Sequence, residues 1–595
     1  MKFKHPGILF VLLALLSVYS CTPDKASEAA AVDFKRTSNE VIVRIDADPE
    51  RIHPLIAFQS YSTLVSSQIF SFLLGTDDQT LQIVPELAVA RPIVESIASG
   101  PYAGGLSYTF EIREAAVWAN NTPVTAADFI FTLKATLHPL VQAQRLRPYL
   151  AFIKDIQIDP ANPKKFTVLT NDTYFLAEEA IGSVIPVMPA YQYDPEGLLA
   201  AVPLTTFTDP EKIEALSKSD ANLQAFAEKF QSPEFSSDPA LISGSGPYTL
   251  ERWEKGQELV LKKKENYWGD GVSAQDGRSL EAFPDRLIFK PIPNAATVLS
   301  LIKSEEIDVV SGLDPLDFVE LQQSEMAKER YELIAAPSDV YTFIYLNTRN
   351  PKLSDKKVRR ALAHAINVEE IITELYEGFG TRTPGPVYPQ APYYNKSLEL
   401  IPYNPSLARK MLEEAGWTDS DNNGIVDKEI NGERVELTLN CNFSGNREVS
   451  RNTVLLLKDQ MQRAGIGLNP VGAEFNVYLA ETRRGDFEMT LGARNAQTVS
   501  WEPRQTWHTE AIGTGSNFSG FGNAESDALI EAIQSNLDET TRFEQYRALQ
   551  QMIYEEQPFV FLFSAQNRLA VHKRFKTKTS VLYPGYALQK LQLIE

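Results

Sequence analysis

Residues 106–134 read LSYTFEIREAAVWANNTPVTAADFIFTLK, and this stretch decides the class of fold. Its first eight residues, Leu106–Arg113, alternate between apolar and polar side chains, which is typical of a β-strand with one buried face. Thr125 and Asp128 then precede the apolar run Phe129–Leu137, a spacing that predicts a capped helix. Strands alternate with helices in this way along the chain, so the sequence predicts an α/β fold.

The same stretch resembles a block found in the extracytoplasmic solute-binding proteins of peptide/nickel-type ABC importers, known as family 5. In that family a strand of the type L-x-Y-T-F-x-[IL]-R is followed by an aromatic residue, a Thr-Pro turn and an apolar helix. Further blocks in family order are Gly244–Tyr248, Lys262–Trp268, Leu301–Asp308, Lys357–Asn367, Tyr403–Trp417 and Asn517–Phe521. Together the blocks span roughly Val41–Arg574, which covers most of the chain.

The resemblance implies a two-lobed periplasmic-binding-protein-like fold, of type II and the large class C with an extra domain. By analogy, domain I comprises residues 39–78, 237–337 and 567–595, domain II residues 79–236 and domain III residues 338–566. Strands from the three segments of domain I would complete one sheet. A monomer of this kind would close its two lobes on a solute and deliver that solute to an ABC permease in the membrane.

The N-terminus resembles the signal peptide of a bacterial lipoprotein over residues 1–20. The apolar run Ile8–Leu16 has the length of a signal peptide and is too short to span a bilayer stably. Val18-Tyr19-Ser20-Cys21 resembles a lipobox, which implies cleavage before Cys21, acylation of that residue and a periplasmic or cell-surface location. An ordinary secretory signal with an incidental cysteine is the alternative. Residues 21–38 would form a flexible tether.

Composition narrows the possible functions. The 595 residues are 43% hydrophobic, ample for a large core, and the net charge is −20. Such an acidic chain without a basic patch is not expected to bind nucleic acid, because phosphates would be repelled. If Cys21 is acylated, Cys441 has no partner for an intrachain disulfide. After the signal sequence, no window of eighteen apolar residues predicts a membrane span.

No catalytic motif emerges from the sequence. The six histidines do not pair at metal-ligand spacing, and HExxH, CxxC and G-x-S-x-G are absent. We therefore expect a binding protein without a catalytic residue or a cofactor, rather than an enzyme. A secreted hydrolase is the alternative from another class, and it would need a nucleophile or an acid/base cluster that the sequence does not display.

One acidic turn has partial calcium-binding character. Oxygen-bearing side chains stand at positions one, three, five and nine of an EF-hand-like loop, namely Asp419, Asp421, Asn423 and Asp427, with Gly424 at position six. Position twelve is Ile430 instead of the bidentate glutamate, which would weaken a calcium ion's binding. A structural calcium and a plain Asx-rich turn both remain open.

The stretch Met489–Phe521 holds the main candidate for ligand binding. We expect a short strand at Glu488–Leu491, then a long loop whose aromatic rings, amides and guanidinium groups suit a pocket for a polar organic molecule. The predicted ligand-binding residues here are Arg494, Asn495, Gln497, Trp501, Trp507 and Phe518. A second candidate segment, where the resemblance implies a ligand-facing loop, comprises Phe58, Gln59, Ser60 and Tyr61, with packing at the lobe hinge as the alternative.

The family comparison leaves the identity of the solute open. In peptide-binding members this loop carries a Trp, and an Asp that meets the ligand's α-ammonium. Counting from the strand puts Arg494 at the Trp and Gln497 at the Asp, whereas counting back from Trp501 puts Val499 at the Asp. Neither register supplies a carboxylate, so Glu502 is the fallback partner for an ammonium group. The solute is expected to be peptide-like or another polar organic molecule, with an oligosaccharide or a metal chelate, bound for sensing or chaperoning, as the alternative.

Overall fold

The computed structural model describes residues 34–57, 59–272, 280–445, 447–496 and 501–594. Met1–Thr37 and Ser38–Glu595 form separate units, and the second contains every element described below. The predicted signal sequence, Cys21, Phe58 and Gln497 lie outside the described residues. Over the ranges that the structure describes, no helix combines the length and the apolar character needed to cross a bilayer.

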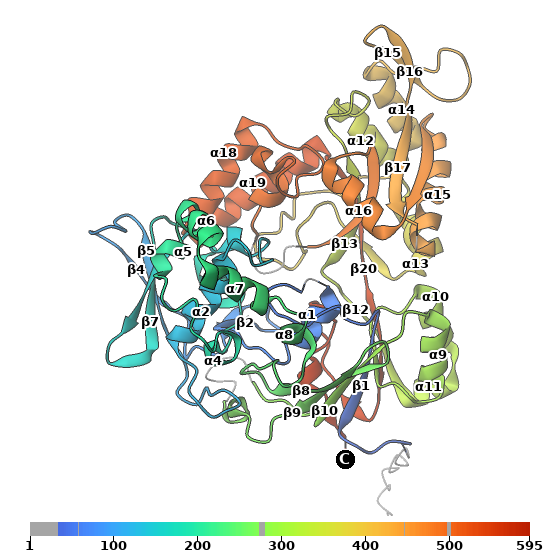
Figure 1. Ribbon diagram of the computed structural model, residues 1–595. Coiled ribbons are helices and arrows are strands. Elements are labelled where there is room, and N and C mark those ends of the chain that lie inside the picture. Colours follow the sequence, from blue (N-terminus) through green and yellow to red (C-terminus); the bar gives the residue numbers. More distant parts are fainter. Residues whose placement is uncertain (1–33, 58, 273–279, 446, 497–500, 595) are drawn as a thin grey trace, which may run out of the picture. The chain divides into compact units, whose positions relative to one another are not determined.

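A seven-stranded sheet takes its strands from the start, middle and end of the chain (Figure 1). Its strands are β1 (Glu40–Ile45), β8 (Tyr248–Glu254), β9 (Glu258–Lys263), β10 (Arg286–Pro291), β11 (Val309–Val310), β12 (Tyr331–Ala336) and β21 (Asn567–His572). The spatial order is β12-β21-β11-β1-β10-β9-β8, with β1 parallel to both of its neighbours. One face of the sheet packs on the helices α9 (Ala295–Lys303), α10 (Pro315–Gln323) and α11 (Glu325–Arg330).

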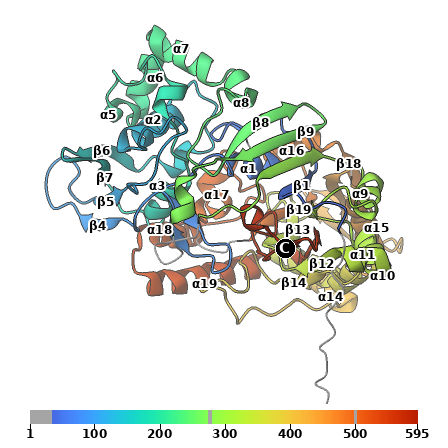
Figure 2. The same cartoon turned by 90° about the horizontal axis from the view of Figure 1, so that it is seen from below.

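A four-stranded antiparallel sheet has the order β4-β5-β7-β6. Its strands are β4 (Ile93–Ser96), β5 (Leu106–Glu111), β6 (Ile153–Asp159) and β7 (Asn162–Thr170). The accompanying helices are α2 (Ala126–Leu137), η1 (Arg147–Tyr149), α3 (Ala177–Ser183), α4 (Ala190–Tyr193), α5 (Leu204–Phe207), α6 (Pro210–Ser219), α7 (Ala221–Phe230) and α8 (Glu234–Ser237). Figure 2 shows α5, α6 and α7 gathered beside α2. This sheet shares one hydrophobic core with the seven-stranded sheet, since Phe110 and Phe166 belong to the same cluster as Val43 and Phe289.

The strand and helix within residues 106–137 fold as predicted. Along β5, Leu106, Tyr108 and Phe110 are buried and the residues between them are only partly covered. The Oδ2 atom of Asp128 accepts the backbone N–H of Thr125 at 2.9 Å, the reach-back bond of a capping box. The strand and the capped helix α2 are therefore confirmed.

A six-stranded sheet has the order β14-β20-β13-β19-β17-β18. Its strands are β13 (Val340–Leu346), β14 (Gly380–Arg382), β17 (Thr438–Ser444), β18 (Gly467–Ala473), β19 (Met489–Asn495) and β20 (Phe559–Ala565). The central strand β13 is buried on both faces: Phe343 and Tyr345 join an aromatic cluster, while Ile344 and Leu346 join an aliphatic one. The sheet therefore separates two cores of different chemistry.

Helices cover both faces of this sheet. The aliphatic cluster includes residues of α12 (Lys356–Ala365), α13 (Val368–Tyr376), α14 (Pro405–Glu414) and α15 (Glu448–Gln462). The aromatic cluster includes residues of α17 (Arg504–Trp507), α18 (Ala524–Ser535) and α19 (Glu539–Glu556). The remaining elements are α1 (Ser60–Ser66), α16 (Phe475–Arg484), η2 (Trp268–Gly271), η4 (Thr509–Ala511), η5 (Leu588–Lys590) and the paired short strands β2/β3 (Leu74–Thr76, Ile83–Pro85), β15/β16 (Asp427–Ile430, Glu433–Glu436) and β22/β23 (Phe575–Lys576, Gln592–Leu593).

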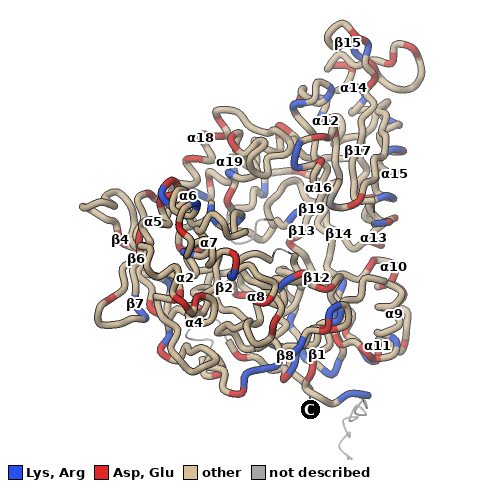
Figure 3. The backbone as a smooth tube through the Cα atoms, in the orientation of Figure 1, with Lys and Arg blue, Asp and Glu red and all other residues tan. Residues whose placement is uncertain are grey.

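Each of the three large sheets lies within the residue ranges of one predicted domain. All strands of the seven-stranded sheet lie within residues 39–78, 237–337 and 567–595. The four-stranded sheet lies within residues 79–236, and the six-stranded sheet within residues 338–566. The boundaries themselves stay a prediction. Charges of both signs are interspersed along the described chain (Figure 3).

One buried ion pair joins the distant segments of the seven-stranded sheet. Asp308, which is 0% exposed, accepts both Nε and Nη2 of Arg574, at 2.8 and 2.9 Å. Its carboxylate also accepts the backbone N–H of Ile42 at 2.8 Å, and Arg574 donates to the carbonyls of Ser38 and Glu40. The side chains beside β11 and β21 therefore satisfy the backbone of β1.

We predict that Asp308→Asn will lower the free energy of unfolding by about 3–5 kcal/mol, because it leaves the Arg574 charge buried without its counter-ion. Urea unfolding of the full chain, followed by circular dichroism, measures this change. Asp459→Asn is the matched control, since it breaks an ion pair to Arg463 in which both side chains are exposed. Equal effects of the two variants would contradict the assigned role of the buried pair.

Candidate functional site

A cavity of about 320 Å³ lies where residues 149–184 meet residues 341–507. This volume is within the range of roughly 300–1,000 Å³ that small-molecule sites occupy. The wall from the first range comprises Tyr149, Tyr174, Leu176, Glu179, Ala180 and Val184. The wall from the second comprises Tyr341, Pro386, Arg494, Asn495, Trp501, Glu502, Gln505, Thr506 and Trp507.

Strand β19 places two of the predicted residues at the cavity. We expected this strand to end at Leu491, but it runs to Asn495, because β13 pairs with it as far as Val340 opposite Asn495. Arg494 lies opposite Tyr341 in this pairing, so both residues line the cavity from adjacent strands. The expectation that Arg494 and Asn495 lie in a loop is therefore wrong. Their backbone is fixed by a sheet, which positions a site more rigidly than a loop does.

The two tryptophans belong to the aromatic core as well as to the cavity wall. Trp501 and Trp507 are each 1% exposed. The Trp501 ring stacks on Tyr546 with centroids 5.4 Å apart, and the Tyr546 hydroxyl donates to the Trp501 carbonyl at 2.6 Å. Trp507 lies 4.8 Å from the ring of Phe559 on β20. Substituting Trp501 would therefore remove core packing along with any ligand contact.

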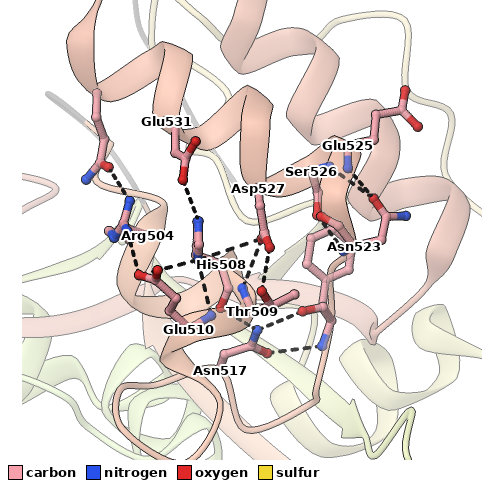
Figure 4. A network of polar contacts seen from close by, with 12 residues as sticks. Arg504, His508, Thr509, Glu510, Asn517, Asn523, Glu525, Ser526, Asp527 and Glu531 are labelled. Carbon is pink, nitrogen blue, oxygen red and sulfur yellow. Dashed lines mark hydrogen bonds and ion pairs between the residues drawn. The ribbon is translucent and has the colours of Figure 1, made fainter.

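A polar network fixes the segment that follows the tryptophans to α18 (Figure 4). The Asp527 carboxylate accepts the backbone N–H of Thr509 at 3.0 Å as well as its hydroxyl. Asn517 donates to the carbonyls of His508 and Phe521 at 3.0 and 2.8 Å. The predicted loop is therefore held by hydrogen bonds from side chains to its backbone, which define the position of α17 beside the cavity.

Glu502 links the two walls of the cavity. Its carboxylate accepts the Tyr174 hydroxyl at 2.9 Å, the Gln534 amide at 3.1 and 3.2 Å and the Arg504 backbone N–H at 2.8 Å. Burial and the negative charge of Glu502 raise the pKa of Tyr174, which keeps this phenol protonated and able to donate. The adjacent Phe175 donates its backbone N–H to the Gln534 carbonyl at 3.1 Å.

The electrostatics of the cavity centre on Arg494. Burial raises the pKa of Tyr149 and of Tyr341, and raises that of Tyr345 to about 12, while the Arg494 charge opposes each of these shifts. The Nη1 atom of Arg494 is buried, and within the described ranges it has no hydrogen-bond partner. A guanidinium group surrounded by phenol and indole rings is therefore the cationic feature of this wall.

The other predicted residues lie elsewhere. Gln59 stands at the N-cap position of α1 and its side chain accepts the Ser62 hydroxyl at 3.2 Å, while neither Ser60 nor Tyr61 is among the residues that line the cavity. Phe518 packs against Tyr345, with centroids 5.9 Å apart, and is likewise outside the cavity lining. Phe58 and Gln497 lie outside the described residues, so the choice between the two family registers remains open.

Sequence reasoning missed the wall formed by residues 149–184. Tyr149, Tyr174 and Glu179 come from this part of the chain, where the adjacent pairs Tyr174-Phe175 and Glu178-Glu179 do not by themselves indicate a binding site. Tyr341 was also missed, although its alternation with Phe343 and Tyr345 along one strand face was a signal that could have suggested an aromatic surface.

In the acidic turn, several carboxylate oxygens already accept hydrogen bonds from neighbouring residues. Asp427 pairs with the Arg434 guanidinium at 3.0 and 3.1 Å and accepts the Ser420 hydroxyl. These bonds, opposing the effect of burial, lower the pKa of the Asp427 carboxyl. Asp419 and Asp421 accept backbone N–H groups of Gly424 and Asn423. Among the described residues, no group of three or more His, Cys, Asp or Glu side chains is arranged to hold a metal ion. Calcium binding at this turn stays a prediction.

Comparison with known proteins assigns the chain to a family. The model of the bacterial extracellular solute-binding proteins, family 5 (middle region), matches residues 83–511. The chain belongs to this family. Family 5 consists of extracytoplasmic binding proteins and not of enzymes, so the predicted family and the expected non-enzymatic class are both confirmed.

Named relatives of this family 5 protein match along nearly its whole length. The oligopeptide-binding protein AppA of Bacillus subtilis (strain 168) is 24% identical over 576 residues, covering 95% of this chain and 93% of AppA. Heme-binding protein A of Haemophilus influenzae is 22% identical over 582 residues, covering 94% and 93%. Glutathione-binding protein GsiB of Salmonella typhi is 21% identical over 528 residues, covering 88% of each.

Solved structures show the same fold. AppA from Bacillus subtilis in complex with a nonapeptide has a TM-score of 0.70 at 21% identity, covering 94% of this chain and 100% of that one. NikA from Brucella suis in complex with Fe(III)-EDTA has a TM-score of 0.71 at 19% identity, covering 93% and 100%. The α/β, two-lobed fold expected of this family 5 protein is therefore confirmed.

We predict that Tyr174→Phe will lower the free energy of unfolding by about 1.5–3 kcal/mol, because a hydrogen bond to the charged Glu502 is lost. Denaturant titration of the full chain measures the effect. Tyr191→Phe is the control, because Tyr191 is a 39% exposed tyrosine that does not line the cavity. If Tyr174→Phe unfolds at the same denaturant concentration as the wild type, the bond does not hold the two walls together.

Proposed function

We propose that this protein captures a small polar organic solute, peptide-like or otherwise, in the cavity around Arg494 and delivers it to an ABC permease. The observation that carries the proposal is the cavity itself, because two parts of the chain that are far apart in sequence both line it. Binding there would favour the arrangement in which both walls contact the solute, so capture works by a shift in population and without bond chemistry.

The relatives support the capture of a solute, but they are named for binding different solutes. They include proteins named for oligopeptide, heme and glutathione binding, and a structural neighbour holds Fe(III)-EDTA. A cavity of about 320 Å³ is at the lower end of the range for small-molecule sites, which favours a compact solute over a long peptide. An oligosaccharide or a metal chelate is an alternative solute of the same site.

The proposal includes export and anchoring. The lipobox-like residues Val18–Cys21 follow an apolar segment of signal-peptide length. Acylation of Cys21 would hold the protein at the membrane, on the periplasmic or cell-surface side. The tether at residues 21–38 would give the folded unit reach toward the permease.

We predict that the full chain, purified in detergent, will melt at a higher temperature with at least one member of a panel of peptides, oligosaccharides and metal chelates. A solute at 100 times its Kd stabilises the folded state by about 2.7 kcal/mol. Thr506→Trp should abolish the shift, because Thr506 lines the cavity and an indole there would occupy the solute's volume.

Thr514→Trp provides the control for this experiment, since Thr514 belongs to the same segment but is exposed and does not line the cavity. This variant should bind like the wild type. A flat melting response of the wild type across the panel would count against solute capture. Equal shifts for the wild type and Thr506→Trp would show that the solute binds elsewhere.

We predict that Cys21→Ser will move the protein from the membrane fraction to the soluble extracytoplasmic fraction. Cys441→Ser is the matched control, because Cys441 is fully buried and should leave the fractionation unchanged. Mass spectrometry of the N-terminal peptide should find acyl groups on Cys21 of the wild type. An unmodified N-terminal peptide would rule out the lipid anchor.

A further inference from the structure

One buried donor atom of a cation that lines the cavity lacks a hydrogen-bond partner among the described residues. Arg494 lines the cavity from β19, and its Nη1 atom is buried without a partner among the residues that the structure describes. Buried donors in native proteins almost always have partners, so an unpaired one calls for a specific explanation, such as a ligand or an ordered water. The guanidinium fork is the protein group best suited to grip a planar carboxylate with two parallel bonds.

The Glu502 carboxylate, which lines the same wall as Arg494, is not available to a ligand's ammonium group. Glu502 already accepts the Tyr174 hydroxyl, the Gln534 amide and the Arg504 backbone N–H. A cationic ligand would have to displace these donors, of which Tyr174 belongs to the opposite wall of the cavity. Glu502 is therefore a structural link, and the fallback role of ammonium partner is disfavoured.

The surroundings of Arg494 strengthen its attraction for an anion. The rings of Tyr341, Trp501 and Trp507 lie in the same lining, and each of these residues is at most 4% exposed. A charge pair is stronger beside such buried rings than in bulk water, because the effective dielectric constant there is lower.

We infer that the solute carries a carboxylate and that Arg494 is the residue that binds it. This inference rests on the proposed function and names the chemical class of its substrate. The opposite arrangement, with an ammonium group on this wall, would place two positive charges together. Glu179 on α3 lines the cavity from the other wall and would disfavour additional negative charge there. The ligand class is therefore an organic acid with a single carboxylate directed at β19.

The test compares acids with their neutral amides. The full chain in detergent is equilibrated with matched acid–amide pairs, comprising N-acetyl tripeptides, aromatic acids and sugar acids. Retained compounds are quantified by mass spectrometry after gel filtration. The wild type should retain acids at least about 10-fold more than their amides, since a charge-assisted bidentate contact is worth that much in affinity. Arg494→Gln should remove the preference, and Arg494→Lys should keep part of it because the charge remains without the fork.

Arg484→Gln is the control, because Arg484 is an exposed arginine on α16 that pairs with Asp486 and lies outside the cavity. It should retain the acids like the wild type. Retention of amides and acids alike, or an unchanged preference in Arg494→Gln, would overturn the inference while solute capture stands. Failure of the wild type to retain any of these acids would also overturn the inference, and capture itself falls only if the melting response to the broader panel is flat as well. Melting temperatures of the unliganded variants show whether each one is folded.

Discussion

The ion pair between Asp308 and Arg574 is the constraint on which the seven-stranded sheet depends. The chain passes through this sheet at its start, in its middle and at its end, and the pair joins all three passages. Burying two charges is costly unless hydrogen bonds satisfy them, and here the backbone N–H of Ile42 and the carbonyls of Ser38 and Glu40 supply the remaining bonds. A polar contact inside an apolar layer thus holds β1, β11 and β21 together.

The six-stranded sheet separates structural from ligand-facing chemistry. Its aliphatic face packs on α12, α13 and α15, which gives a conventional core. Its aromatic face carries Tyr341, Phe343 and Tyr345, and the cavity opens where these rings meet Trp501 and Trp507. Large rings leave irregular space between them and carry polar atoms at their edges, so an aromatic face is suited to enclose a polar organic molecule. The alternation of side chains along β13 therefore decides both the packing and the place of the site.

The sequence was most informative where its signals were local. The alternation of Leu106–Ile112 and the capping pair Thr125/Asp128 depend on neighbouring residues, and both features are present in the structure. Arg494, Trp501 and Trp507 were found because they stand in one unusual segment. The extension of β19 to Asn495 was missed, since only its pairing with β13 makes those residues a strand.

Contacts between distant segments could not be predicted from local patterns in the sequence. Tyr149 and Tyr174 belong to no binding motif of the sequence, and only the fold brings them to the cavity. The same is true of Glu502, whose position in the sequence suggested a free carboxylate. Its bonds to Tyr174 and Gln534 span 328 and 32 residues. No local pattern encodes whether a charged side chain is already satisfied by partners so far away.

A chain with a net charge of −20 can nevertheless offer a site for an acid. At physiological ionic strength, charges on the surface are screened over about 8 Å, so the many exposed carboxylates contribute little inside a cavity lined by rings. The electrostatic potential inside the cavity is set by the nearest groups. Among these, Glu502 is already hydrogen-bonded, and Arg494 retains a donor without a partner among the described residues. The surface charge therefore governs solubility, while the electrostatic character of the cavity is set by the groups that line it.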